Sequence, residues 1–156
     1  MTDNSNNNKN FVFVQGKTKN IFVKFPASTE IEEGSAIYPA NNGTGTYIIA
    51  DGTAGQEIGI IRQTIKSTDI NPPYDEVKEV PMEVPLDIFA ELEFAVGAGT
   101  FTAADVGKTV DLHTDGKSIA VDTDTKKQFL ITGYISATRG LGRFLGGGRT
   151  GLPLTT

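Results

Sequence analysis

The chain has 156 residues, a formal net charge of −5 and no cysteine. This length suits one domain, with or without tails, and can bury a core without covalent staples. The missing cysteines exclude disulfides, thiolate metal sites and a cysteine nucleophile, and the single histidine excludes a site built from several histidines. No apolar run approaches the roughly 20 residues of a membrane span, and the polar N-terminus does not resemble a secretory signal. We therefore expect no membrane partner and synthesis in the cytoplasm.

The composition predicts a mainly β fold. The chain contains 14 isoleucines, 10 valines and 19 threonines but only 8 leucines, and β-branched side chains suit pleated sheets better than helices. The 18 glycines are well above the usual share and indicate many turns. We expect a small antiparallel β-barrel or sandwich, or two small β lobes, with one short helix and flexible terminal arms.

The charge is unevenly distributed along the chain. Residues 1–29 carry a net charge of +3 and residues 125–156 carry +5, whereas residues 30–124 carry −13. An acidic body repels nucleic acid, so we expect no nucleic-acid partner. The two basic ends can still meet an acidic protein surface.

The N-terminal elements are a tail and two strands. Residues 1–10 are polar and rich in asparagine, which predicts a disordered arm. Apolar runs at 11–15 and 20–25 predict two strands that could form a hairpin, and Pro26 ends the second.

Three turn-bounded strands follow and predict a meander. They are expected at 35–38, 46–50 and 56–65, separated by the turn signals NNGTG and DGTAG. The next segment contains a double proline, so residues 66–75 are a candidate hinge between two lobes. No repeat of fixed length is visible beyond the spacing of the hairpins.

A strand with unusual prolines is predicted from Val80 to Ile88, where apolar and other residues alternate. Pro81 and Pro85 occupy the opposite parity. Because proline has no amide hydrogen, we expect this strand to lie at an edge or to be interrupted. From Asp87 to Ala95 a helix is an alternative, but we favour a strand.

The C-terminal third begins with one predicted helical turn, capped by Thr102 and ended by Gly107. A strand at 108–114, a DGK hairpin turn and a returning strand follow. Residues 128–139 predict a long strand or a strand pair, with a bulge at Gly133. We therefore expect one β domain over residues 11–138 and a glycine-rich C-terminal arm over residues 139–156.

The glycine-rich segment 142–151 could also be compared with a phosphate-binding loop. It has Arg149 and Thr150 where that motif has lysine followed by serine or threonine, and Pro153 follows where the motif opens a helix. We interpret it instead as part of a flexible arm that docks on another protein. Its predicted anchors are Phe144, Leu145, Leu152 and Leu154, with Arg139, Arg143 and Arg149 as charge partners. The alternative arm is residues 9–25, anchored by Phe11 and Phe13.

Other chemistry is weakly indicated. His113 is expected on the solvent-facing side of a strand between Asp111 and Asp115, with no identifiable nucleophile. Clusters of carboxylates at 30–33, 75–79 and 111–124 match neither a calcium loop nor a glycosidase pair. We interpret them as a solvated acidic face and expect no metal, no cofactor and no enzymatic activity.

A further pattern is the order of segments along the chain, which includes no invariant chemical motif. The runs EEGSAIYPANNGTGTYIIADGTAGQEIGII, VPLDIFAELEFAVGAG, ADVGKTVDL, DGK and FLITGYISATRGLGRFLG occur in this order over roughly residues 30–140. This order and its turn spacing resemble the decoration (cement, or head-stabilising) proteins of tailed-bacteriophage capsids. The chain is longer than the short lambda-like members and has extensions at both ends.

The resemblance implies a structural protein of the virion. Family members lie on the outside of the shell, often as trimers, and clamp neighbouring major capsid subunits, several of them with an extended terminal arm. The expected partners are the major capsid protein and further copies of this chain. Two alternatives stay open: a tail or head-fibre domain that binds glycans through Tyr38, Tyr47 and Tyr74, and a small hydrolase that uses His113.

Overall fold

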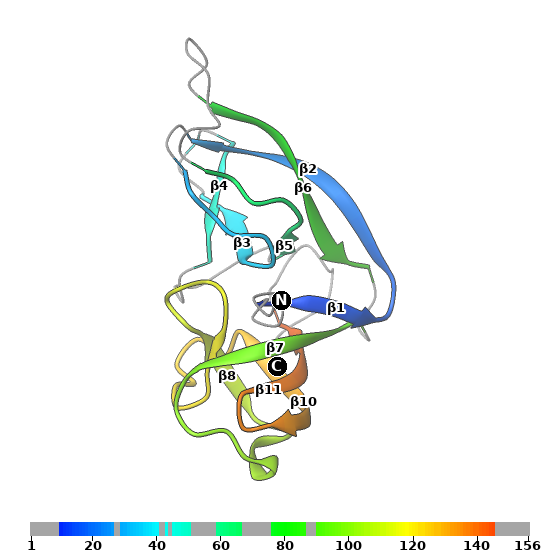
Figure 1. Ribbon diagram of the computed structural model, residues 1–156, viewed down its shortest axis with the longest axis vertical. Coiled ribbons are helices and arrows are strands. Elements are labelled where there is room, and N and C mark those ends of the chain that lie inside the picture. The colour runs from blue at the N-terminus through cyan, green and yellow to red at the C-terminus, as the bar shows by residue number, and fades with distance from the viewer. Residues whose placement is uncertain are drawn as a thin grey trace, which may run out of the picture.

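A computed structural model describes residues 10–26, 29–40, 43, 45–50, 59–66, 76–86 and 90–145, without the side chains of 76–79. Within these residues the protein is mainly β, as the composition predicts. Its strands form two sheets that follow one another along the long axis of the molecule (Figure 1). The N-terminal arm predicted over residues 1–10 lies outside the described residues, except for Asn10.

The first sheet contains five strands, which we call the N-unit. They are β2 (Thr18–Pro26), β3 (Ala36–Pro39), β4 (Tyr47–Ile49), β5 (Gly59–Ile61) and β6 (Glu76–Pro85). Their spatial order is β2-β6-β5-β3-β4, and every neighbouring pair is antiparallel. A single parallel bridge between Lys24 and Thr46 brings the end of the sheet back to β2.

The second sheet contains six strands, of which β7 to β11 form what we call the C-unit. They are β1 (Val12–Gln15), β7 (Glu91–Ala98), β8 (Thr109–Leu112), β9 (Ile119–Ala120), β10 (Phe129–Ser136) and β11 (Arg139–Phe144). The spatial order is β1-β7-β11-β10-β8-β9, and a parallel pairing of β9 with β7 closes a five-stranded barrel. The expected small barrel is therefore confirmed, with β1 added on the outside of β7.

The two units repeat one topology. When the five strands of each unit are numbered in chain order, both have the spatial order 1-5-4-2-3, and in both the third strand returns parallel to the first. The first strands begin at residues 18 and 91 and the second strands at 36 and 109, so both pairs start 73 residues apart, whereas the third, fourth and fifth strands start 72, 70 and 63 residues apart. This is a repeat of topology without a fixed sequence period, and the sequence pattern did not indicate it.

One turn shows the repeat at atomic detail. Gly34 and Gly107, again 73 residues apart, both adopt a left-handed backbone, with φ of 89° and 97°. The Gly34 N–H donates to the carbonyl of Ile61 (2.9 Å), and the Gly107 N–H donates to the carbonyl of Ile131 (2.8 Å). Two more backbone hydrogen bonds occur in both units with the same lengths. The Ser35 N–H donates to the Glu32 carbonyl, as the Lys108 N–H donates to the Asp105 carbonyl (both 3.1 Å). The Ile61 N–H donates to the Ser35 carbonyl, as the Ile131 N–H donates to the Lys108 carbonyl (both 3.0 Å).

The boundary between the units differs from the predicted hinge at 66–75. Because β6 completes the N-unit and β7 begins the C-unit, the division falls at residues 86–90. Residues 67–75 lie outside the described residues, between β5 and β6 of one unit. The predicted hinge segment therefore falls between two strands of the N-unit and not between the two units.

Two predicted strand pairings also differ. The expected hairpin between 11–15 and 20–25 does not form, since β1 pairs with β7 and β2 pairs with β6. The meander is replaced by a sheet in which β5 returns beside β3. Local spacing identified these strands, but long-range pairing decided their neighbours.

The proline-containing strand β6 is not at an edge, because it lies between β2 and β5. The alternative of an interrupted ladder was correct, since β5 pairs with it only through Met82 and Glu83. The Pro81 carbonyl accepts a hydrogen bond from the Arg62 N–H (2.9 Å). The two prolines, which have no N–H to donate, therefore face β5, with which β6 forms only a short ladder.

The start of the predicted C-terminal arm is instead part of the barrel. Residues 139–144 form β11, which lies between β7 and β10. Gly140 and Gly142 are buried there, and a side chain at either would collide with the rings of Phe94 or Phe129. These glycines let aromatic rings lie against the backbone, whereas the sequence suggested flexibility. Residues 146–156 lie outside the described residues.

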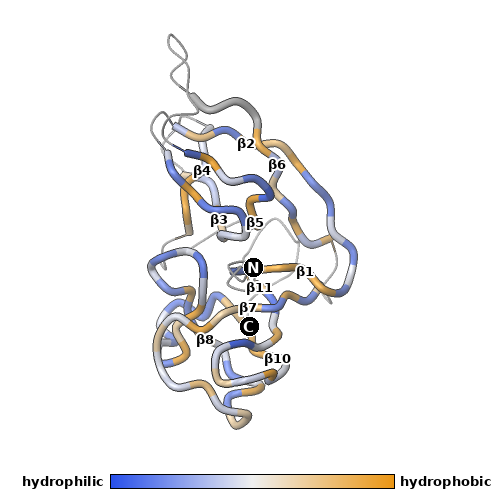
Figure 2. Tube along the Cα trace, viewed as in Figure 1, coloured by the Kyte–Doolittle hydropathy of each residue, from blue (hydrophilic) through white to orange (hydrophobic). Residues whose placement is uncertain are grey.

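The buried apolar residues form two clusters, and Figure 2 shows apolar residues along the strands of both units. One cluster lies within the N-unit, and the other combines the C-unit core with Ala36, Tyr38, Ala50 and Ile60 of the N-unit. The C-unit core contains a group of phenylalanine rings in which Phe129 contacts both Phe94 and Phe144. The N-unit core consists largely of isoleucine, valine and methionine with Phe25. The predicted helical turn is confirmed as a 3-10 helix, η2 (Ala103–Asp105), capped by Thr102.

Candidate functional site: exposed strand edges and their neighbours

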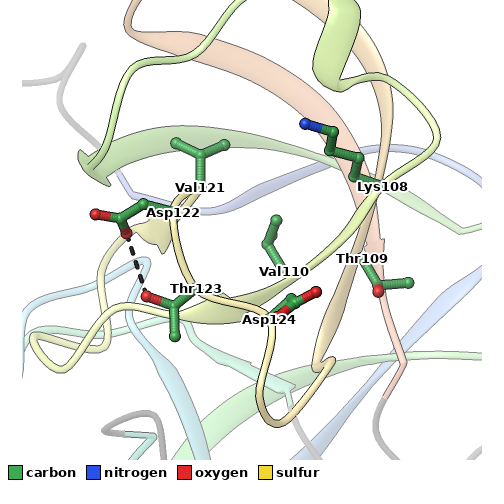
Figure 3. A pocket seen from close by; sticks show the side chains of 7 residues that line it. All are labelled: Lys108, Thr109, Val110, Val121, Asp122, Thr123 and Asp124. Carbon is green, nitrogen blue, oxygen red and sulfur yellow. Dashed lines mark hydrogen bonds between the residues drawn. The ribbon is translucent and has the colours of Figure 1, made fainter.

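A shallow cavity of about 460 Å³ lies beside β8 in the C-unit. It is lined by Thr109 and Val110 of β8, by Lys108 and by residues 121–124 of the following loop (Figure 3). Asp122 and Asp124 point in different directions in this view, and the Asp122 carboxylate accepts a hydrogen bond from the Thr123 hydroxyl (3.2 Å). The lining offers no paired acid and base.

The carboxylates near His113 have structural roles. Asp111 is buried, and its Oδ1 accepts backbone N–H bonds from Lys126 (2.7 Å) and Lys127 (2.8 Å), which holds the loop before β10. Asp115 accepts from the backbone N–H of Lys117 (2.8 Å) and thus closes the predicted hairpin turn. His113 is half-buried rather than fully exposed as predicted. No polar contact joins its imidazole to either aspartate among the hydrogen bonds of the described residues.

Two acidic residues at equivalent turns of the two units each hold a lysine. Asp105 accepts from Lys108 Nζ (2.8 Å) and from the Thr102 N–H (2.9 Å). The Lys108 bond is the main cause that lowers the pKa of Asp105. Glu32 accepts from Lys117 Nζ (2.9 Å), and this bond raises the pKa of Lys117. The Glu32–Lys117 pair also joins the two units.

The phenylalanines predicted to anchor a docking arm are instead part of the core. Phe11 is buried, Phe144 is only 9% exposed, and their ring centroids lie 5.3 Å apart. Phe13 is half-buried and contacts Phe144 from the side (6.5 Å). Because these side chains face inward, they cannot serve as anchors for a partner while the barrel is intact.

The other predicted contact residues are distributed as follows. Arg139 forms an ion pair with Glu93 of the neighbouring strand β7. Arg143 is half-buried on β11, as is Leu145 just after it. Arg149 and Leu152 lie outside the described residues. The structure therefore brings three of the predicted residues into contact, because Phe11 and Phe13 both pack against Phe144.

Two of the three tyrosines proposed for a glycan site are not exposed in the described residues. Tyr38 is buried in the core and cannot stack on a sugar, Tyr47 is half-buried, and Tyr74 lies outside the described residues. The exposed tyrosine is Tyr134 of β10, whose ring packs against Phe101 (5.1 Å).

The exposed apolar side chains lie mainly on strands. Val12 and Val14 face solvent on β1, the terminal strand of the six-stranded sheet, and Val14 is 50% exposed. Phe22 of β2 is 63% exposed, and Leu86, just after β6, is 56% exposed. Alternation in the run FVFVQ predicts two faces of a strand, but it does not tell which face is buried. The sequence pattern therefore pointed to the phenylalanines and left the valines unidentified.

Two searches of the described residues gave negative results. Residues 10–145, apart from the gaps given above, contain no group of three or more histidine, aspartate or glutamate side chains placed to hold a metal ion. In the same residues no helix is long and apolar enough to cross a membrane.

Comparison with known proteins does not assign the chain to a family. No family model matches it, and no curated protein and no solved structure is significantly similar.

Proposed function

We propose that the chain is a structural protein of a virus particle that binds the outer surface of a tailed-bacteriophage capsid and stabilises contacts between major capsid subunits. The observation that carries this proposal is the terminal strand β1, which exposes Val12 and Val14 beside a barrel. An edge strand with outward apolar side chains is suited to pairing with another protein. The order of segments that resembles capsid decoration proteins supplies the identity of that partner.

The charge distribution supports docking through the N-terminal strand. Residues 10–26 contain three lysines and no acidic residue, whereas the body of the chain is acidic. The basic strands can therefore approach an acidic protein surface while the body stays exposed. In this arrangement the valines of β1 contact the capsid, and the phenylalanines of the same strand hold it in the barrel.

The test is a count of this chain in purified particles of the virus that encodes it. Quantitative mass spectrometry should give a ratio to the major capsid protein near one, or a simple fraction set by the symmetry of the shell. If the protein binds as a homotrimer, the number of copies per particle should be a multiple of three. A few copies per particle would favour the tail or fibre alternative, and absence from particles would overturn the proposal.

A matched pair of variants tests the contact surface. Val14→Asp places a charge on the outer face of β1 and should reduce binding to particles lacking this protein at least tenfold. Val106→Asp changes a residue that is 43% exposed near η2 and should leave binding within twofold of the wild type. Equal binding of both variants would exclude the outer face of β1. Truncation after Leu145 tests the C-terminal arm without removing β11.

A further inference from the structure

The internal repeat predicts a second strand-binding edge. In the C-unit the first strand, β7, has β11 on one side, and two partners share its other side. Residues 96–98 of β7 pair there with β9, and residues 91–93 pair with β1. The N-terminal half of this side of β7, residues 91–93, therefore accepts an additional antiparallel strand. We call this part of the first strand the half-edge.

The N-unit presents the same half-edge without a paired strand. Its first strand, β2, pairs with β6 along one side, and Lys24 bridges to Thr46 on the other side. Residues 18–20 are equivalent to residues 91–93 at the offset of 73. No described strand pairs with β2 at Thr18–Phe22 on this side.

The register of β2 shows that its backbone groups are directed to that side. The Pro81 carbonyl bonds to Arg62, so Pro81 directs its backbone polar groups toward β5. Phe22 pairs with Pro81 and therefore directs its own N–H and C=O away from β6. Asn20 has the same parity, so its N–H points to the open half-edge as well.

Exposed side chains around the half-edge favour a protein strand as its occupant. Phe22 is largely exposed, and Leu86, whose N–H donates to the Lys17 carbonyl (2.8 Å), is exposed at the start of β2. Lys19 and Lys24 of β2 and Lys17 just before it are also exposed. Apolar side chains beside unpaired backbone groups suit β-strand addition, and the lysines favour acidic side chains on the incoming strand.

We propose that the half-edge Thr18–Phe22 accepts an antiparallel strand of a partner protein that carries alternating apolar residues and acidic side chains. In the C-unit the occupant β1 has this alternation, with Phe11 and Phe13 directed inward. The chain's own C-terminal residues 146–156 contain one arginine and no acidic residue, so their charge does not complement the lysines. This proposal is independent of whether the partner belongs to a capsid.

The test uses the full chain and a synthetic peptide, DFVFVQE, which is the β1 sequence between two acidic residues. Amide NMR and hydrogen exchange should show that Asn20 and Phe22 exchange rapidly in the free protein and become protected when the peptide is added. The matched peptide KFVFVQK should bind at least threefold more weakly at low salt. Shifts confined to residues 91–93 would show displacement of β1 and would overturn the proposal.

A pair of variants at one position separates the backbone from the side chain. Asn20→Pro removes the outward N–H, which an edge position tolerates, and should weaken peptide binding at least tenfold. Asn20→Ala keeps the N–H and should bind within twofold of the wild type. Equal binding of all three proteins would contradict strand addition here. The Asn20 and Phe22 amides could instead become protected without peptide as the protein concentration is raised. That result would assign the edge to a second copy of this chain and overturn the partner proposal.

Discussion

The N-unit and the C-unit share strand order, orientation and one glycine turn, but they fill their cores with different side chains. The C-unit packs Phe94, Phe101 and Phe129 into contacting pairs. The N-unit packs aliphatic side chains such as Ile61 and Met82. The comparison teaches that backbone pairing and the left-handed glycine define this unit, whereas its core tolerates different apolar residues as long as they fill the space.

Closure of the sheet also differs between the units. The C-unit closes through two parallel pairs between β7 and β9, and the N-unit through one bridge. The N-unit compensates with a long ladder between β2 and β6, which spans eight paired positions from Thr18 to Pro26. The two units thus reach a similar shape with different distributions of backbone pairing.

The largest effect is expected from truncating the aromatic core. Phe129 contacts Phe11, Phe94 and Phe144, so Phe129→Ala should lower the free energy of unfolding by about 4 kcal/mol. Met82→Ala in the other core should cost about 3 kcal/mol. Chemical denaturation followed by circular dichroism measures both. Phe22→Ala, at an exposed position, is the control and should change stability by less than about 0.5 kcal/mol. A loss below about 1 kcal/mol in Phe129→Ala would contradict the aromatic core.

A smaller effect is expected from adding a methyl group to the glycines. Gly142→Ala places Cβ against the Phe129 ring and the Leu130 carbonyl, so it should cost about 3 kcal/mol through overpacking. Gly107→Ala meets no atom within 4 Å but must adopt a φ of 97°, so it should cost only about 1 kcal/mol. Thermal unfolding of both variants separates steric from conformational roles. Equal losses would indicate that Gly142 serves flexibility, as the sequence suggested.

The smallest effect is a pH dependence at the turn of the C-unit. The pKa of Asp105 is lowered from its ordinary value of 3.8, mainly by the Lys108 bond. The folded state therefore binds fewer protons than the unfolded state near this pH, and the stabilisation is present above pH 3.8 and lost as the pH falls through the folded pKa. Asp105→Asn should flatten this loss in unfolding curves measured between pH 5 and 2.

Thr102→Ala is the matched control for this pH dependence. It removes the capping hydroxyl that accepts the Ala104 N–H, and it should lower stability by about 1 kcal/mol. Because the hydroxyl does not titrate, the loss should be similar at every pH. An unchanged acid dependence in Asp105→Asn would show that other carboxylates dominate.

The sequence predicted local structure better than pairing. Period-two apolar patterns located most strands, Thr102 and Gly107 located the 3-10 turn, and Gly133 marked a real bulge in the register of β10. Pairing of β1 with β7 could not be predicted, because no local signal joins residues about 80 positions apart. The repeat was hidden because equivalent positions carry different residues, such as Ile37 in the N-unit and Val110 in the C-unit.

The candidate site was predicted less well than the fold. Glycine-rich sequence near Gly140 and Gly142 suggested an arm, because spacing alone cannot distinguish flexibility from close packing of rings on the backbone. Alternation in β1 identified two faces but not the burial of Phe11, which depends on the distant Phe144. The open half-edge at Asn20 became visible only through comparison of the two units.

The attachment of β1 to β7 has a consequence for synthesis of the protein. Val12 pairs with Glu93, so β1 leaves the ribosome long before its partner strand. At about 5–20 residues per second, the interval is roughly 4–16 s. During this interval the N-unit can complete its ladder, while the aromatic side chains of β1 still lack the core that covers them. The first strand of the chain thus reaches its final position among the last, and a chaperone that shields it would act in this interval.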